Sequence, residues 1–180
     1  MAAAPLPHPP EGDPGGGHPR RGVLADRAAE LAEVLTEEPF LRQLDLRTDA
    51  EFALGFRLPR TNLVAGDEHR AALGLGPDEY LLIGVADAGA EPGHRSAVDV
   101  SAARTSLRVR DRRVLNALCA LDLHPRVFTP GCCAQTRLAR VPVILWRLDA
   151  DYRVLVSRSH AGHVATALLG ARQANPGVAQ

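Results

Sequence analysis

The pattern of apolar and polar residues changes its period near residue 77. Between Asp26 and Leu35, apolar residues recur with helical spacing, and Pro39 limits how far that helix can run. Thr48-Asp-Ala-Glu51 has the form of a capping box, and Gly and Pro break up the short apolar stretches around it. Residues 22–76 are therefore predicted to form short helices and loops.

Residues 77–175 show the spacing of β-strands, framed by helical patterns. Helices are predicted after Asp111 and from Ser159 to Gly170, and the best hairpin signal is the Asp149-Ala-Asp151 turn. Three more segments are predicted as strands besides the two of this hairpin, and the full set is 80–86, 97–100, 105–110, 141–148 and 152–158. We predict an α+β fold for a single domain over residues 22–175. Short N-terminal helices precede a mixed or antiparallel sheet, which has a C-terminal β-hairpin and flanking helices.

Residues 1–21 differ from the rest in composition. Pro and Gly are too frequent there for the segment to bury enough apolar surface to offset the entropy lost on ordering. A disordered tail is predicted.

Charge and composition exclude several classes of function. The chain has 21 basic and 21 acidic residues, so no net field attracts nucleic acid or an anionic membrane, and neither is expected as a partner. No apolar run approaches the ~20 residues that span a bilayer. The cytoplasm is the expected location, or the interior of a host cell if the chain is viral. Every basic residue is Arg, which rules out a lysine-containing phosphate loop, and the common hydrolase and metalloprotease motifs are missing.

Cys119 and Asp122 are the first candidates for chemistry. They are three residues apart on the helix predicted after Asp111, so their side chains would share one face. A carboxylate beside a thiol can relay a proton to or from sulfur or its ligand. The alternative is a small buried Cys on a Leu-rich face, with Asp122 ending the helix.

A metal site is the second candidate. Cys132 and Cys133 follow a Pro-Gly turn, and two adjacent thiolates are soft ligands. His160 and His163 are spaced so that a helix could present both to a metal, although no zinc-finger spacing is present. With Cys119, these residues form the predicted set of metal ligands. The alternative for both His residues is exposure on a helix surface.

Residues 105–145 resemble the alkylmercury (organomercurial) lyase family. The segment from Asp111 to Asp122 contains Cys-Ala-Leu-Asp, and Cys133-Ala-Gln-Thr is followed by an apolar strand from Val141. The resemblance implies that Cys119 binds mercury and that Asp122 handles the proton that cleaves the carbon–mercury bond. It gives Cys133 a mainly structural role and requires no organic cofactor. Because no Cys follows Cys133, Cys132 or Cys133 would have to replace the family's later thiol.

A second resemblance leads to the alternative function. Residues 142–169 form a strand–turn–strand–helix unit similar to that of immunity-type and betaherpesvirus regulatory domains, which bind other proteins. The leading hypothesis is a thiol-based protein, lyase-like or metal-binding, that acts on an organomercurial or a soft metal ion through Cys119 and Asp122. The alternative is a non-catalytic module with a protein partner and inert, buried cysteines.

Overall fold

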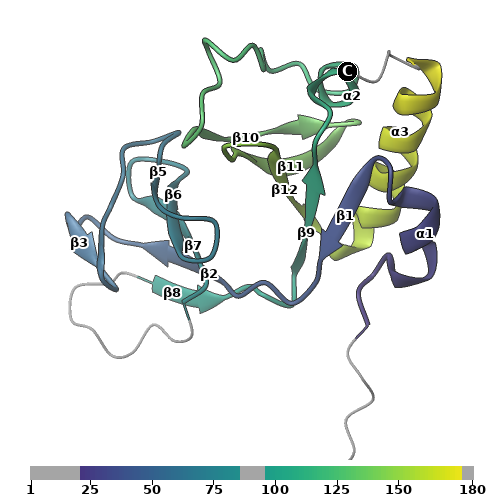
Figure 1. Cartoon of the computed structure of the whole chain (residues 1–180). Helices are drawn as coiled ribbons and strands as arrows, with labels where there is room; N and C mark the ends of the chain where they lie inside the picture. The colour runs from purple at the N-terminus through teal and green to yellow at the C-terminus, as the bar shows by residue number, and fades with distance from the viewer. Residues whose placement is uncertain (1–20, 86–95, 176–180) are drawn as a thin grey trace, which may run out of the picture.

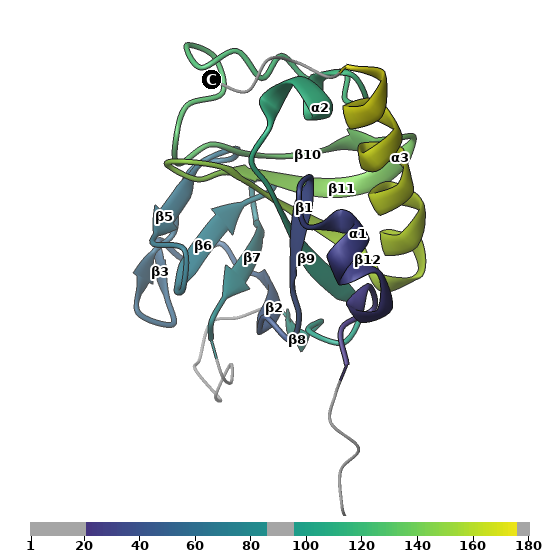
Figure 2. The same ribbon diagram turned by 45° about the vertical axis from the view of Figure 1, so that its right-hand side comes forward.

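The computed structural model describes residues 21–85 and 96–175, which form two stacked β-sheets with helices on one side (Figures 1 and 2). Each sheet has five strands, and all neighbouring strands within the described residues run antiparallel. The α+β class is thereby confirmed. No helix in the described part of the chain is long and apolar enough to cross a membrane.

Sheet A lies in the middle of the molecule (Figure 1). In spatial order its strands are β1 (Leu35–Glu38), β9 (Arg104–Val109), β12 (Tyr152–Ser157), β11 (Val141–Arg147) and β10 (Cys133–Leu138). The predicted hairpin is confirmed, since β11 and β12 pair with Leu145 opposite Val154. The strand at Cys133–Leu138 was not predicted from its residue pattern.

Sheet B packs against one face of sheet A. Its strands, in spatial order, are β5 (Val64–Gly66), β6 (Ala71–Gly74), β7 (Glu79–Ile83), β2 (Gln43–Arg47) and β8 (Ser96–Asp99). Leu73, Leu81 and Ile83 of sheet B pack with Ile144, Trp146 and Leu155 of sheet A. A small hairpin, β3 (Phe52–Ala53) with β4 (Phe56–Arg57), packs on the opposite face of sheet B.

Three helices cover the other face of sheet A. They are α1 (Ala28–Leu31), which follows a 3-10 turn at Ala25–Arg27, α2 (Arg112–Asn116), and α3 (Ala161–Ala174), which follows a 3-10 turn at Arg158–His160. Asp111 caps α2 by accepting a hydrogen bond from the main-chain N–H of Arg113. Both predicted helices exist, but α3 continues through Gly170, where an added Cβ would meet nothing within 4 Å.

The helical prediction for residues 22–76 is wrong outside Ala25–Leu31. Residues 35–74 instead supply six strands, from β1 to β6. The capping-box residue Thr48 accepts a hydrogen bond from Ala50 N (3.1 Å), a local turn that leads into the β3–β4 hairpin. These short apolar stretches are stabilised by burial between layers, which a pattern along the chain does not reveal. The predicted tail, residues 1–21, lies outside the described residues except for Arg21.

Candidate functional site

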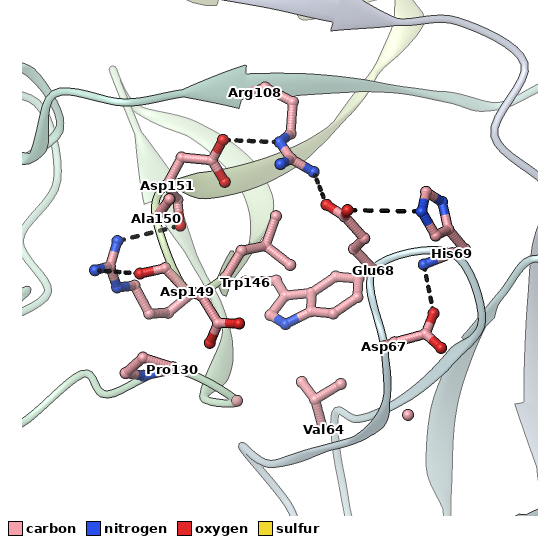
Figure 3. A pocket seen from close by; sticks show the side chains of 14 residues that line it. Val64, Asp67, Glu68, His69, Arg108, Pro130, Trp146, Asp149, Ala150 and Asp151 are labelled. Carbon is pink, nitrogen blue, oxygen red and sulfur yellow. Dashed lines mark hydrogen bonds and ion pairs between the residues drawn. The ribbon is translucent and has the colours of Figure 1, made fainter.

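A large cavity lies where the β11–β12 turn approaches the loop between β5 and β6 (Figure 3). Its volume is about 810 Å³. The turn contributes Asp149, Ala150 and Asp151, and the loop contributes Asp67, Glu68 and His69. Trp146 and Arg147, at the end of β11, complete the wall beside Arg108 of β9. The cavity is therefore built from both sheets.

An ion pair behind the cavity fixes β1 to the centre of sheet A. Arg153 is 2% exposed and donates two hydrogen bonds to Glu38, at 2.8 and 2.9 Å, while Ser106 donates a third at 2.7 Å. Burial alone would raise the pKa of Glu38, but the bonds from Arg153 and Ser106 and the charges of Arg153 and Arg108 outweigh it and lower that pKa. Glu38 is therefore held as a carboxylate.

Arg108 extends this network to the cavity wall and to sheet B. Its Nε donates to Asp151 (3.0 Å), and one terminal nitrogen contacts both Glu68 (2.8 Å) and Glu38 (3.3 Å). Arg153 also donates to the main-chain oxygen of Glu68 (2.7 Å). Because Glu68 belongs to the β5–β6 loop, these bonds hold that loop of sheet B against β9 and β12 of sheet A.

Two cation–π contacts hold the ends of β11 and β12. The guanidinium carbon of Arg153 lies 4.9 Å from the ring centre of Trp146, and that of Arg147 lies 4.5 Å from the ring centre of Tyr152. Arg147 also donates to the main-chain oxygens of Asp149 and Asp151, each at 3.2 Å. The β11–β12 turn is therefore fixed from both sides.

The network was not predicted from the sequence. Arg153 alternates with Tyr152 and Val154 along β12, a pattern that is also typical of a solvent-facing charged residue. Its partner Glu38 lies 115 residues earlier, in the part of the chain predicted as short helices and loops. No local signal links the two residues.

The predicted pair of Cys119 and Asp122 is not on one helix. Helix α2 ends at Asn116, and Cys119 makes an isolated β-bridge with Leu138. Cys119 is 8% exposed, and its sulfur lies 3.7 Å from the Thr136 hydroxyl. Asp122 is exposed in the following loop, where it accepts a hydrogen bond from the main-chain N–H of His124 (2.8 Å). The shared helical face is therefore a wrong prediction.

Cys133 faces the opposite side of sheet A from Cys119. It is fully buried, and its thiol donates toward the main-chain oxygens of Leu63 (3.4 Å) and Gly74 (3.6 Å) in sheet B. Burial, with Cys132 next to it, raises the pKa of Cys133 to about 12. Thr136, which contacts Cys119, is three residues along β10 from Cys133, a spacing of about 10 Å. The two sulfurs are thus separated by the sheet.

The other predicted ligands do not gather with these thiols into one metal site. Cys132 is half-buried and contacts the Thr129 hydroxyl at 3.4 Å, and all three cysteines are free. His160 and His163 are exposed, and Nε2 of His163 contacts the main-chain oxygen of Ala139 (3.1 Å). Within residues 21–85 and 96–175, no three His, Cys, Asp or Glu side chains are grouped so that they could hold a metal ion.

Comparison with known proteins gives a consistent group of relatives. No family model matches the chain. The chain is 35% identical over 171 residues to a sarcosine oxidase subunit gamma of Corynebacterium sp. strain U-96, with 82% of each chain covered. It is 42% identical over 148 residues to the subunit of the same name from Arthrobacter sp., covering 69% of this chain and 72% of the relative.

A solved structure agrees with these relatives. The fold matches a chain of the heterotetrameric sarcosine oxidase from Corynebacterium sp. U-96, solved in complex with pyrrole 2-carboxylate. The TM-score is 0.74 at 31% identity, and the match covers 89% of this chain and 98% of the other.

These relatives overturn both functional hypotheses from the sequence. The resemblance of residues 105–145 to alkylmercury lyases is wrong, and with it fall the soft-metal lyase and metal-binding functions built on Cys119 and Asp122. The resemblance to immunity-type or viral regulatory modules is wrong as well. Both rested on short segments, whereas the relatives match most of the chain.

Proposed function

The chain belongs to the family of sarcosine oxidase gamma subunits, and we propose from this that it works as one subunit of a heterotetrameric oxidase. The observation that carries the proposal is the structural match, which spans 98% of a chain from such a heterotetramer. The protein partners are then the other subunits of the oxidase.

The proposed substrate is sarcosine or a closely related N-alkyl amino acid. Pyrrole 2-carboxylate, which is bound in the related complex, shares with sarcosine a nitrogen and a carboxylate on the same carbon. We expect it to compete with sarcosine in the oxidase that contains this chain. Such competition would support a substrate class in which that nitrogen and carboxylate are recognised together.

We further propose that this chain holds no organic cofactor of its own, as the sequence analysis expected. The supporting observation is the Gly74-Leu-Gly76 segment, which lacks the third glycine of a dinucleotide fingerprint and connects strands β6 and β7 instead of opening a helix. The redox chemistry would then belong to other subunits. Visible absorbance that stays with this chain after the complex is dissociated would contradict this proposal. The cytoplasmic location stays a prediction.

Co-expression tests the main proposal. A tagged form of this chain is produced together with the other oxidase subunits from the same source, and the purified material is analysed by gel filtration and for sarcosine-dependent oxygen uptake. We expect one four-chain peak with activity that pyrrole 2-carboxylate inhibits. The matched control omits this chain. A chain that elutes alone while the other subunits assemble and turn over sarcosine without it would overturn the proposal.

A further inference from the structure

The cavity between the two sheets carries more negative charge than its own cations neutralise. Its wall contains four carboxylates and two guanidiniums, from Asp67, Glu68, Asp149 and Asp151 and from Arg108 and Arg147. Arg108 is already shared with Glu38 outside the wall, and Arg147 donates to main-chain oxygens. The carboxylates of the wall outnumber its guanidiniums by two, and this excess of negative charge favours a cationic ligand.

Asp149 is the wall residue best placed to meet such a ligand. It is exposed at the turn between β11 and β12, and no described cation lies within ion-pair distance of its carboxylate. Its main chain is fixed, because Arg147 donates to its carbonyl and Leu148 N donates to Asp151 O (2.9 Å). The carboxylate is therefore held on a turn fixed by hydrogen bonds, and the described residues give it no ion-pair partner.

Two polar atoms of the wall make no hydrogen bond among the described residues. The Asp151 side chain is 10% exposed, and its buried Oδ1 has no hydrogen-bond partner. The indole N–H of Trp146, a residue that lines the cavity, donates to none of the described residues (Figure 3). Because buried polar groups are nearly always paired, the open Asp151 Oδ1 indicates a ligand with a donor, and the Trp146 N–H favours one that supplies both a donor and an acceptor. A peptide segment with a basic side chain does so, through its cation and its carbonyl groups.

We propose that this cavity receives an Arg or Lys side chain, with its flanking backbone, from another subunit of the oxidase. The inference rests on the proposed function, because it requires a protein partner. Asp149 pairs with the cation at the mouth of the cavity, and the Trp146 N–H donates to a carbonyl of the incoming segment. At about 810 Å³ the cavity has room for such a side chain together with its flanking backbone.

Charge reversal at Asp149 tests the proposal in the co-expressed complex. We expect Asp149→Arg to weaken binding of this subunit to the others by roughly tenfold or more, and Asp149→Asn to weaken it less. The matched control is Asp26→Arg, which makes the same charge change at a side chain that is 83% exposed and outside the cavity wall. Trp146→Phe keeps a ring for the Arg153 contact but removes the N–H together with part of the indole ring, and is expected to weaken binding severalfold. Equal binding by the wild type and the Asp149 variants would overturn the inference while leaving the proposed function intact.

Photo-cross-linking identifies the occupant directly. A benzophenone amino acid is placed at position 149 of the assembled complex, with position 26 as the control, and cross-linked peptides are sequenced. We expect a cross-link next to an Arg or Lys of another subunit, whose change to Glu restores binding to the Asp149→Arg variant. Cross-links found only within this chain would overturn the inference. A wild-type chain that joins no complex would overturn the proposed function, and the inference with it.

Discussion

The two faces of sheet A are both buried, but their chemistry differs. The helix-covered face is apolar and includes Leu107, Leu145 and Val154, all at most 1% exposed. The face toward sheet B combines apolar residues, such as Trp146, with the ion pair between Glu38 and Arg153. One sheet thus has a mainly apolar core on one side and, on the other, a core that also depends on matched charges.

The difference shows two ways of fixing one layer on another. Hydrophobic burial is non-directional, so an apolar face stabilises a helix layer but specifies its position only through the fit of side chains. Hydrogen bonds from a guanidinium require a set geometry. Those from Arg108 and Arg153 to Glu68, a residue of the β5–β6 loop, therefore define how sheet B sits on sheet A.

Deleting apolar volume from the helix-covered face should have the largest effect on stability. Leu107 is fully buried, so Leu107→Ala is expected to lower the free energy of unfolding by about 3 kcal/mol through lost burial and a residual cavity. Urea denaturation measures the change. A loss below about 1 kcal/mol would show that this face packs loosely, contrary to the comparison.

Breaking the ion pair on the opposite face should have the next largest effect. Glu38→Gln leaves the Arg153 guanidinium buried without its carboxylate, and we expect it to lower the free energy of unfolding by about 2 kcal/mol. The loss is smaller than for a fully buried pair because the Glu38 side chain is 28% exposed. The control is Glu51→Gln, which breaks the exposed pair with Arg57 and should change stability by less than about 0.5 kcal/mol. Equal losses in the two variants would mean that burial adds nothing to the Glu38 pair.

The face of sheet A toward sheet B, which contains Glu38, should make the free energy of unfolding depend on pH. The pKa of Glu38 in the folded protein lies below its ordinary value of 4.5, so its stabilising contribution is complete above that pH and is lost as the pH falls through the folded-state pKa. Unfolding free energies measured from pH 7 downward should drop below about pH 4.5, and the drop should be smaller in Glu38→Gln. The Leu107→Ala variant should keep the slope of the wild type. If the unfolding free energy of Glu38→Gln fell with pH as steeply as that of the wild type, Glu38 would not contribute to the loss of stability in acid.

Chemical modification of the cysteines should distinguish the half-buried thiol from the two buried ones, and it is the smallest of the expected effects. Cys132 is half-buried, whereas Cys133 is fully buried and its pKa is raised to about 12 by that burial, with Cys132 beside it. We expect a disulfide reagent at pH 8 to modify Cys132 first, and Cys119 and Cys133 only after unfolding, because the thiolate is the reactive form. The rapid phase should disappear in Cys132→Ser. A rapid phase that persists there would show that a core thiol opens readily.

Sequence patterns determined the regular parts of sheet A. The turn at Asp149–Asp151 and the alternating segments on either side predicted the β11–β12 hairpin, and the segment 105–110 predicted β9. Asp111 correctly marked the start of α2. In each case the determining interaction is local, between residues close in the chain, so the pattern carries the information.

Sequence patterns also predicted β7 and β8, but only the tertiary structure decided the other strands of sheet B and the cavity. Ala71, Ala72 and Leu73 of β6 are all fully buried, because sheet A covers one of their faces and the β3–β4 hairpin covers the other, so no alternation marks the strand. The pairing of Glu38 with Arg153 joins residues 115 positions apart. A charged residue gives the same local pattern whether it faces water or a buried partner, and its surroundings are set only when the two sheets stack.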